Sequence, residues 1–217
     1  MSKKNIAILL GATGLTGSAL LNELLSSNYY DEIKVIARKN LNILDSRIEL
    51  IQIKSLNELS NLDLNFQNAT YFCCLGTTLK TAGTKENFKA VDLKAVVDFA
   101  LLAKKFNAFK FILISAMGAN PNSTIFYNQV KGQAEQEILK LQIPGTVIFR
   151  PSLLLGERSE KRKLESFFIK VAGAISKILS PKIEKLIGTK ISVLVKRMVE
   201  VAMEQNQNSI VFNSSEI

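Results

Sequence analysis

Residues 11–17 read Gly11-Ala12-Thr13-Gly14-Leu15-Thr16-Gly17, three glycines at a spacing of three. An apolar run at 6–10 precedes them, and a helical pattern at 18–25 follows. Glycines permit a tight turn with positive φ, and they let backbone N–H groups approach a pyrophosphate at a helix N-terminus. Between a strand and a helix, this motif predicts a dinucleotide-binding turn, with an ordinary βα turn as the alternative.

The composition narrows the possible functions. The chain has 217 residues, a formal net charge of +9 and a pI of about 9.5, which suits nucleic acid, an anionic membrane or a phosphorylated cofactor. It contains no histidine, which excludes His-based triads and removes the commonest metal ligand. We therefore expect no metal site, and acid–base chemistry from Tyr, Lys, Asp, Glu or Cys.

The cysteines and the apolar runs suggest a location. Cys73 and Cys74 are adjacent in an apolar run, so they cannot link distant segments and should be reduced core residues. The N-terminal apolar run is too short for a signal peptide, and no run reaches the length of about 18 residues that a membrane helix needs. These features predict a soluble, cytoplasmic protein.

Strand and helix patterns alternate along the chain. We expect strands at 6–10, 32–37, 48–53, 69–75, 109–114 and 146–149, with an edge strand at 210–212, and helices at 18–25, 85–106, 125–141 and 191–203. This order predicts one α/β domain over residues 1–217, a Rossmann-type doubly wound parallel sheet. Residues 1–150 would form the cofactor-binding core, and residues 151–217 a small cap on the substrate side together with closing elements.

Two strand ends carry candidate cofactor contacts. Arg38 and Lys39 follow the second strand, where an acid binds the ribose of NAD and an arginine accommodates the 2′-phosphate of NADP. The basic pair predicts NADP, with solvated loop charges as the alternative. Gly76 and Thr77 follow the fourth strand and could line the diphosphate or the nicotinamide ribose, although a plain turn is nearly as compatible.

A second set of residues suggests catalysis. Tyr127 and Lys131 are four apart in a helical pattern, so their side chains share one face. A nearby ammonium stabilises tyrosinate and lowers a phenol pKa that starts near 10. Ser115 ends the preceding strand and would orient a substrate carbonyl while Tyr127 donates a proton.

These residues carry a resemblance to a known family. The glycine stretch, the basic pair, Ser115 with Gly118, and Tyr127 with Lys131 resemble the motifs of an atypical short-chain dehydrogenase/reductase. More narrowly, the chain resembles the Tat-interacting-protein branch and its bacterial NAD(P)H-binding oxidoreductase-like relatives, through residues 73–78, 88, 91–92, 127–132 and 149–151. The resemblance covers most of residues 5–163.

The resemblance implies an NADPH-binding Rossmann protein and a set of cofactor contacts. The positions that match are Thr13, Gly14, Leu15, Thr16, Arg38, Lys39, Leu75, Tyr127, Lys131, Leu154 and Arg162. Arg162 would close on the cofactor phosphates, with Arg158, Lys161 and Lys163 as alternatives for the same role. Many relatives show two serines after the fifth strand, whereas this chain has Ser115-Ala116, so only Ser115 can orient a carbonyl. If that role belongs one position later, Ser123 or Thr124 could fill it only through loop geometry.

The sequence after residue 156 gives the least information about function. Between 157 and 190 there are nine Lys or Arg against four Glu, interleaved with apolar residues, a pattern typical of a basic amphipathic helix. It would pack on the sheet, or serve as a substrate lid, a dimer surface or a membrane-surface helix.

Two functions remain open. The first is an NADPH-dependent oxidoreductase that transfers hydride to a small carbonyl-like substrate, with Tyr127 as general acid. The alternative is an NADPH-binding regulatory or redox-sensing protein with little turnover that acts through a protein partner. A homodimer is a further expectation, whereas nucleic-acid and membrane contacts have less support because the dinucleotide motif already explains much of the charge.

Overall fold

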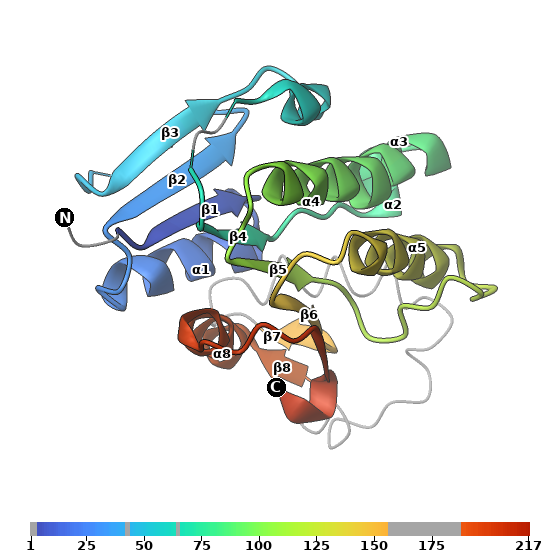
Figure 1. Ribbon diagram of the computed structural model, residues 1–217. Helices are drawn as coiled ribbons and strands as arrows, with labels where there is room; N and C mark the ends of the chain where they lie inside the picture. The colour runs from blue at the N-terminus through green and yellow to red at the C-terminus, as the bar shows by residue number, and fades with distance from the viewer. Residues whose placement is uncertain (1–3, 42–43, 64–65, 156–187) are drawn as a thin grey trace.

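A seven-stranded parallel sheet forms the centre of the computed structural model (Figure 1). The structure describes residues 4–41, 44–63, 66–155 and 188–217. The strand order is β3-β2-β1-β4-β5-β6-β9. The bounds are β1 Ile6–Leu10, β2 Glu32–Ala37, β3 Ile48–Gln52, β4 Thr70–Cys73, β5 Lys110–Ile114, β6 Thr146–Arg150 and β9 Ile210–Asn213. The chain winds outward from β1 in one direction and from β4 in the other, which confirms the predicted Rossmann-type fold.

The inner strands form because their sequences are apolar on both faces. Every residue of β4 and β5 is buried, including Phe72 and Phe111. Parallel strands covered by helices on both sides show such continuous apolar runs. The edge strand β3 instead contains only half-buried and exposed residues, as expected for a strand with one neighbour.

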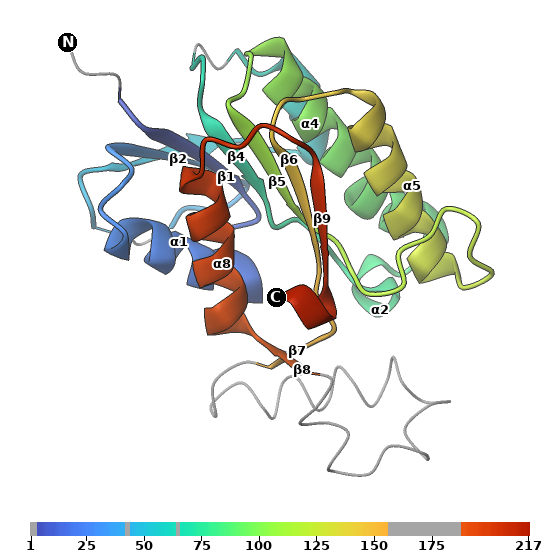
Figure 2. The same ribbon diagram turned by 60° about the horizontal axis from the view of Figure 1, so that its bottom comes forward.

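Helices cover both faces of the sheet (Figures 1 and 2). On one face, α1 (Leu15–Ser26) and α8 (Ile191–Met203) pack together over a core that includes Leu20 and Met198. On the other face, α4 (Val96–Lys105) and α5 (Phe126–Lys140) pack over Phe99 and Ile138. Shorter helical segments are η1 (Leu56–Asn61), α2 (Leu79–Ala82), α3 (Lys85–Lys89), η2 (Ala90–Ala95) and η3 (Ser214–Glu216).

The crossover between β4 and β5 differs from the expected uninterrupted helix at 85–106. It runs as α3, then a π-helical segment, η2, and then α4. A π-helical segment shifts the side-chain register within a helix and occurs often at functional sites. Here it lies between α3 and α4 and carries a buried aspartate, Asp92.

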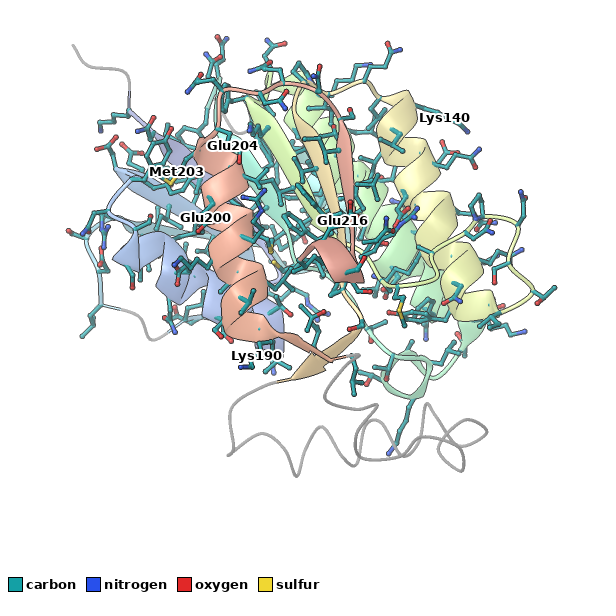
Figure 3. All side chains as sticks on the ribbon, turned by 90° about the horizontal axis from the view of Figure 1, so that it is seen from below. Lys140, Lys190, Glu200, Met203, Glu204 and Glu216 are labelled. Carbon is teal, nitrogen blue, oxygen red and sulfur yellow. The ribbon has the colours of Figure 1, made fainter. Side chains whose placement is uncertain are left out.

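Most of the described residues between 151 and 217 add a strand to the central sheet and a helix to the layer that covers it. β9 pairs in parallel with β6, which confirms the expected edge strand, and α8 covers the sheet from Lys190 at one end to Glu204 at the other (Figure 3). A separate two-stranded sheet joins β7 (Leu153–Leu155) to β8 (Gly188–Lys190). Most of the basic segment predicted at 157–190 lies outside the described residues.

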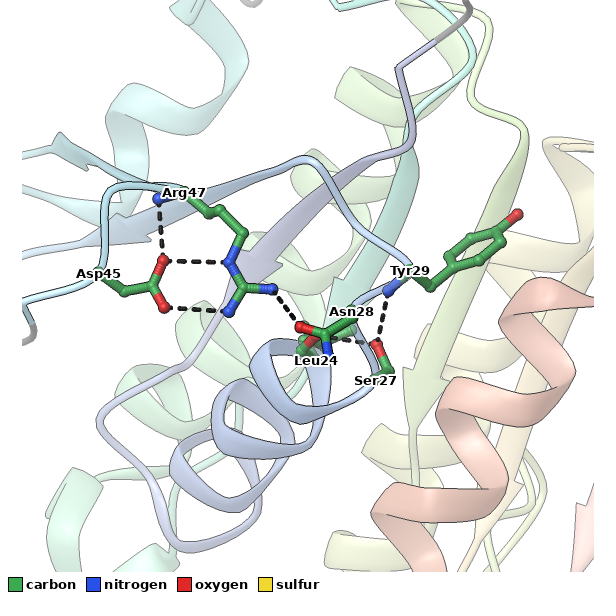
Figure 4. A network of polar contacts seen from close by, with 6 residues as sticks. All are labelled: Leu24, Ser27, Asn28, Tyr29, Asp45 and Arg47. Carbon is green, nitrogen blue, oxygen red and sulfur yellow. Dashed lines mark hydrogen bonds and ion pairs between the residues drawn. The ribbon is translucent and has the colours of Figure 1, made fainter.

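A polar network lies at the end of the sheet where the strands begin, opposite their carboxyl ends (Figure 4). Arg47 donates to both carboxylate oxygens of Asp45, at 3.1 and 3.0 Å, and to Asn28 at 3.4 Å. Asn28 follows α1 with a positive φ of 51°, so the network ties the end of α1 to the start of β3.

None of the described helices has the length and apolar character needed to cross a membrane.

Candidate functional site

The candidate site lies at the carboxyl ends of the strands. The two halves of the sheet diverge between β1 and β4, and in open α/β sheets ligands bind at such a switch point. The loops after β1, β4 and β5 all lie at this end of the sheet. They contain, in turn, the predicted glycine turn, Gly76 with Thr77, and Ser115.

Close backbone contacts define the glycine turn. Gly11 has a φ of +94°, and a Cβ there would lie 2.6 Å from the Cys74 carbonyl carbon. A Cβ on Gly17 would lie 2.1 Å from the Gly11 carbonyl oxygen. The Gly14 N–H donates to the same oxygen at 3.1 Å. Both glycines are required by contact with backbone, which brings β1, α1 and the loop after β4 into one compact turn.

The N-terminus of α1 points its first N–H groups toward this edge. Gly14 is the N-cap, and the first turn has neither a side-chain cap nor an acidic residue. Thr13 and Gly14 are exposed, whereas Thr16 and Gly17 are buried. An uncapped helix start with the positive end of its dipole is suited to an anionic group.

Arg38 and Lys39 lie at the same edge, directly after β2, and both side chains are exposed. β2 is the neighbour of β1 in the sheet. The two cations therefore lie beside the glycine turn, on the side away from β4.

Ser115 follows β5, and its side chain is buried with a relative exposure of 6%. Its N–H donates to the Phe149 carbonyl at 2.7 Å, which fixes the backbone against β6. The hydroxyl forms no hydrogen bond with any described residue. A buried hydroxyl without a partner is costly, by about 1–3 kcal/mol, and a ligand oxygen could satisfy it. The next residue, Ala116, has no such group.

Tyr127 lies in the first turn of α5 and is half-buried. Its ring packs on Phe88 of α3 with a centroid distance of 5.8 Å. Phe88 is fully buried and also contacts Phe126. The start of α5 is thus held against the crossover helix through aromatic contacts, which fixes the tyrosine ring.

Lys131, one turn after Tyr127, forms a buried ion pair with Asp92. Its Nζ lies 2.7 Å from Asp92 Oδ1, and the side chains are 8% and 0% exposed. The second oxygen of Asp92 accepts the N–H of Thr77 at 2.8 Å. A Cβ on Gly76 would lie 3.6 Å from Lys131 Nζ. The structure therefore brings Lys131, Gly76 and Thr77 together around Asp92.

Opposing effects set the charge of Lys131. Burial would lower the pKa of its ammonium, but the charges of Asp92 and Tyr127 outweigh burial and raise the pKa above its ordinary value. Burial raises the pKa of the neighbouring Cys73 thiol to about 12. Cys73 is buried and both cysteines are free, so the site holds a charged lysine beside a neutral thiol.

Two buried carboxylates lie near this helix face: the sequence analysis included Asp92 only as a position of resemblance, and it did not name Glu135. Asp92 had a detectable signal, because an acid stands in the apolar face of the 85–106 pattern. Glu135, one turn beyond Lys131, is 3% exposed and accepts from Arg150 Nε at 3.1 Å with both oxygens. This pair raises the pKa of the Arg150 guanidinium and joins α5 to β6.

Two further predicted contacts come after β6 in the chain. Leu154 lies in β7, half-buried, and packs on the core beneath α1 and α8. Arg162 lies outside the described residues.

The loop between Ser115 and α5 is fixed to that helix, because the Asn120 N–H donates to the Asn128 carbonyl at 3.0 Å.

Comparison with known proteins places the chain in a family. It is 35% identical over 160 residues to protein FMP52-1, mitochondrial, of Scheffersomyces stipitis, covering 73% of this chain and 71% of the relative. It is also 35% identical over 181 residues to protein HTATIP2 of Rattus norvegicus, covering 81% and 73%. The chain belongs to the atypical short-chain dehydrogenase/reductases, in the Tat-interacting-protein branch. No family model matches the sequence.

Solved structures show the same fold. MoeE5 in complex with UDP-glucose and NAD has a TM-score of 0.71 at 15% identity, over 96% of this chain and 75% of that one. Human epimerase family protein SDR39U1 with NADPH has a TM-score of 0.65 at 15% identity, over 96% and 73%. At these identities the likeness concerns the fold, which this atypical short-chain dehydrogenase/reductase shares over nearly its whole length.

The cytoplasmic location predicted from the sequence is wrong by this comparison. Curated fungal members of the branch, including those of Scheffersomyces stipitis, Debaryomyces hansenii and Candida albicans, are named as mitochondrial proteins. The prediction used reduced cysteines and the lack of a long apolar run. Both features are equally compatible with a mitochondrial protein, so they could not distinguish the two locations.

Proposed function

We propose that the protein is an NADPH-dependent oxidoreductase that reduces a small carbonyl-like substrate. The observation that carries the proposal is the position of Lys131. Its ammonium is buried one turn from Tyr127 and lies 3.6 Å from where a Cβ on Gly76 would be, at the end of the sheet that holds the glycine turn. A lysine in that place can both stabilise a tyrosinate and reach a ribose hydroxyl.

The residues at this edge fit a nicotinamide dinucleotide. Gly11 and Gly17 bring the turn close enough for backbone N–H groups to meet a pyrophosphate, and α1 offers an uncapped N-terminus. MoeE5 and SDR39U1, which share the fold, bind NAD and NADPH respectively. In our proposal the remaining contacts come from Thr13, Gly14, Leu15, Thr16, Leu75, Gly76, Thr77, Tyr127, Lys131, Leu154 and Arg162.

Arg38 and Lys39 support a preference for NADPH over NADH. Both are exposed cations directly after β2, where this fold meets the adenosine ribose. A guanidinium can pair with the 2′-phosphate through two parallel hydrogen bonds and stack on adenine.

The proposed chemistry needs a proton donor and an oxygen-orienting group. Reduction adds hydride to the carbonyl carbon and a proton to its oxygen, giving an alcohol. A bound nicotinamide dinucleotide supplies the hydride. The Ser115 hydroxyl donates a hydrogen bond to the carbonyl oxygen, Tyr127 donates the proton, and Lys131 stabilises the tyrosinate that remains.

Ala116 favours the alternative, a regulatory or redox-sensing protein that binds NADPH and acts through a protein partner. If the orienting hydroxyl belonged at residue 116, the site would bind the cofactor without activating a carbonyl. Such a protein would bind NADPH as tightly as an enzyme but would show no turnover with any carbonyl substrate.

Binding of NADPH and NADH by calorimetry tests the proposal. We expect the wild-type protein to bind NADPH more tightly, and Arg38→Asp to weaken NADPH binding by about 10- to 100-fold while changing NADH binding by less than about threefold. Arg197→Asp is the control, because it makes the same charge change on α8, where Arg197 pairs with Glu200. Equal weakening by both substitutions, or no nucleotide binding at all, would contradict the assignment.

A further inference from the structure

Asp92 is a buried acid that the proposed chemistry does not use. It lies in η2 with a fully buried side chain. A buried carboxylate is tolerated only where charges and hydrogen bonds compensate for its lost hydration. Asp92 has one partner on each oxygen: Lys131 Nζ at 2.7 Å from Oδ1, and the Thr77 N–H at 2.8 Å from Oδ2.

These two partners come from different parts of the site. Thr77 lies in the loop after β4, and Lys131 lies on α5. Asp92 comes from the crossover between them, at the π-helical segment where the helical register shifts. One side chain therefore connects the loop, the crossover helix and the helix of Tyr127.

An exposed glycine, Gly76, lies next to this ion pair. A Cβ on it would lie 3.5 Å from Asp92 Oδ1 and 3.6 Å from Lys131 Nζ. A larger residue there would crowd the pair. The pair is thus buried, with side chains 8% and 0% exposed, yet it lies beside an exposed residue of the loop where we propose that a cofactor binds.

Asp92 supplies the counter-charge for the ammonium. Within the described residues, three titratable groups face Lys131: Asp92 from η2, Tyr127 from α5 and Cys73 from β4. The Cys73 thiol is neutral because burial raises its pKa to about 12, whereas Asp92 contributes both a charge and a hydrogen bond that raise the pKa of Lys131. Without Asp92, burial would dominate and would lower the pKa of Lys131.

We propose that Asp92 is a positioning residue, whose carboxylate keeps the Lys131 ammonium charged beside Gly76 and fixes the Thr77 loop to the same point. The proposal rests on the proposed cofactor role of Lys131. It predicts that replacing Asp92 affects both the charge of Lys131 and the fixing of the Thr77 loop, although Asp92 itself touches neither substrate nor cofactor.

The pH dependence of NADPH binding by Asp92→Asn tests this role. Asparagine keeps the shape and can still accept the Thr77 N–H, but it removes the negative charge. In the wild-type protein the pKa of Lys131 is raised, so its contribution persists until the pH passes the ordinary lysine value of about 10.4. In the variant the pKa falls, and we expect NADPH affinity to drop at least about tenfold between about pH 7 and pH 9.5.

Two further variants isolate the cause. In Asp92→Asn/Lys131→Arg the guanidinium stays charged at every accessible pH, so the added pH dependence should disappear. Glu135→Gln neutralises another buried carboxylate on α5, one that pairs with Arg150, and it should leave the pH profile unchanged. A folded Asp92→Asn protein with the wild-type profile would overturn the proposal.

A direct titration of Lys131 separates this proposal from the proposed function. NMR of protein containing isotope-labelled lysine, with the Lys131 signal assigned from its absence in Lys131→Arg, needs neither cofactor nor turnover. We expect the wild-type signal to titrate above the ordinary lysine range. Titration below that range would overturn the role of Asp92 even if Asp92→Asn did not fold. Failure of nucleotide binding with a high lysine pKa would contradict only the proposed function.

Discussion

Gly17→Ala is expected to lower the free energy of unfolding by about 3–5 kcal/mol and to abolish binding of a dinucleotide. A Cβ at this position would lie 2.1 Å from the Gly11 carbonyl oxygen and 2.7 Å from its carbon. Both are backbone atoms, so no side chain can rotate to relieve the overlap. Relief requires α1 to move away from the turn, which also displaces the N–H groups proposed to meet the pyrophosphate.

Gly14→Ala is the matched control for this prediction. A Cβ on Gly14 would lie 3.4 Å from the same oxygen, and its φ of −82° is accessible to alanine. We expect a change of no more than about 1 kcal/mol. Urea denaturation of the two variants measures the difference, and equal stabilities would show that the close approach at Gly17 has no energetic importance.

Local patterns were sufficient to predict the main sheet. The runs that form β1, β4 and β5 are short, apolar and followed by turn residues. Their alternation with helices favours a parallel sheet. The pairing of β7 with β8 could not be predicted, because Gly188–Lys190 has no strand periodicity and is recognisable only by its contact with Leu153–Leu155. Sequence periodicity describes single elements, whereas this pairing depends on contacts between distant ones.

The site was predictable where spacing within one helix determines it. Tyr127 and Lys131 could be placed on one face because four residues make about one helical turn. Asp92 was not identified as their neighbour, because it reaches Lys131 from another element and through a π-helical segment that apolar periodicity does not reveal. A charged residue in an apolar helical face was the available signal, and it indicates a buried ion pair without naming its partner.

Tyr127→Phe is expected to lower kcat by about 10²- to 10⁴-fold while changing NADPH affinity by less than about threefold. The substitution removes only the phenolic oxygen, and the ring can keep its contact with Phe88 at 5.8 Å. The proton donor is then missing, but the ammonium of Lys131 stays paired with Asp92. NADPH oxidation with a panel of aldehydes and ketones measures turnover, and calorimetry measures binding.

Tyr29→Phe provides the control for the loss of a hydroxyl, because Tyr29 lies just after α1, at the edge of the sheet opposite the site (Figure 4). It should leave both turnover and binding unchanged. Turnover that survives Tyr127→Phe would place the general acid elsewhere. A wild-type protein that binds NADPH but turns over no substrate would instead favour the regulatory function. In that case the buried Lys131, kept charged by Asp92, would serve to hold the cofactor, because a charge that binds the ribose does not require a reaction to follow.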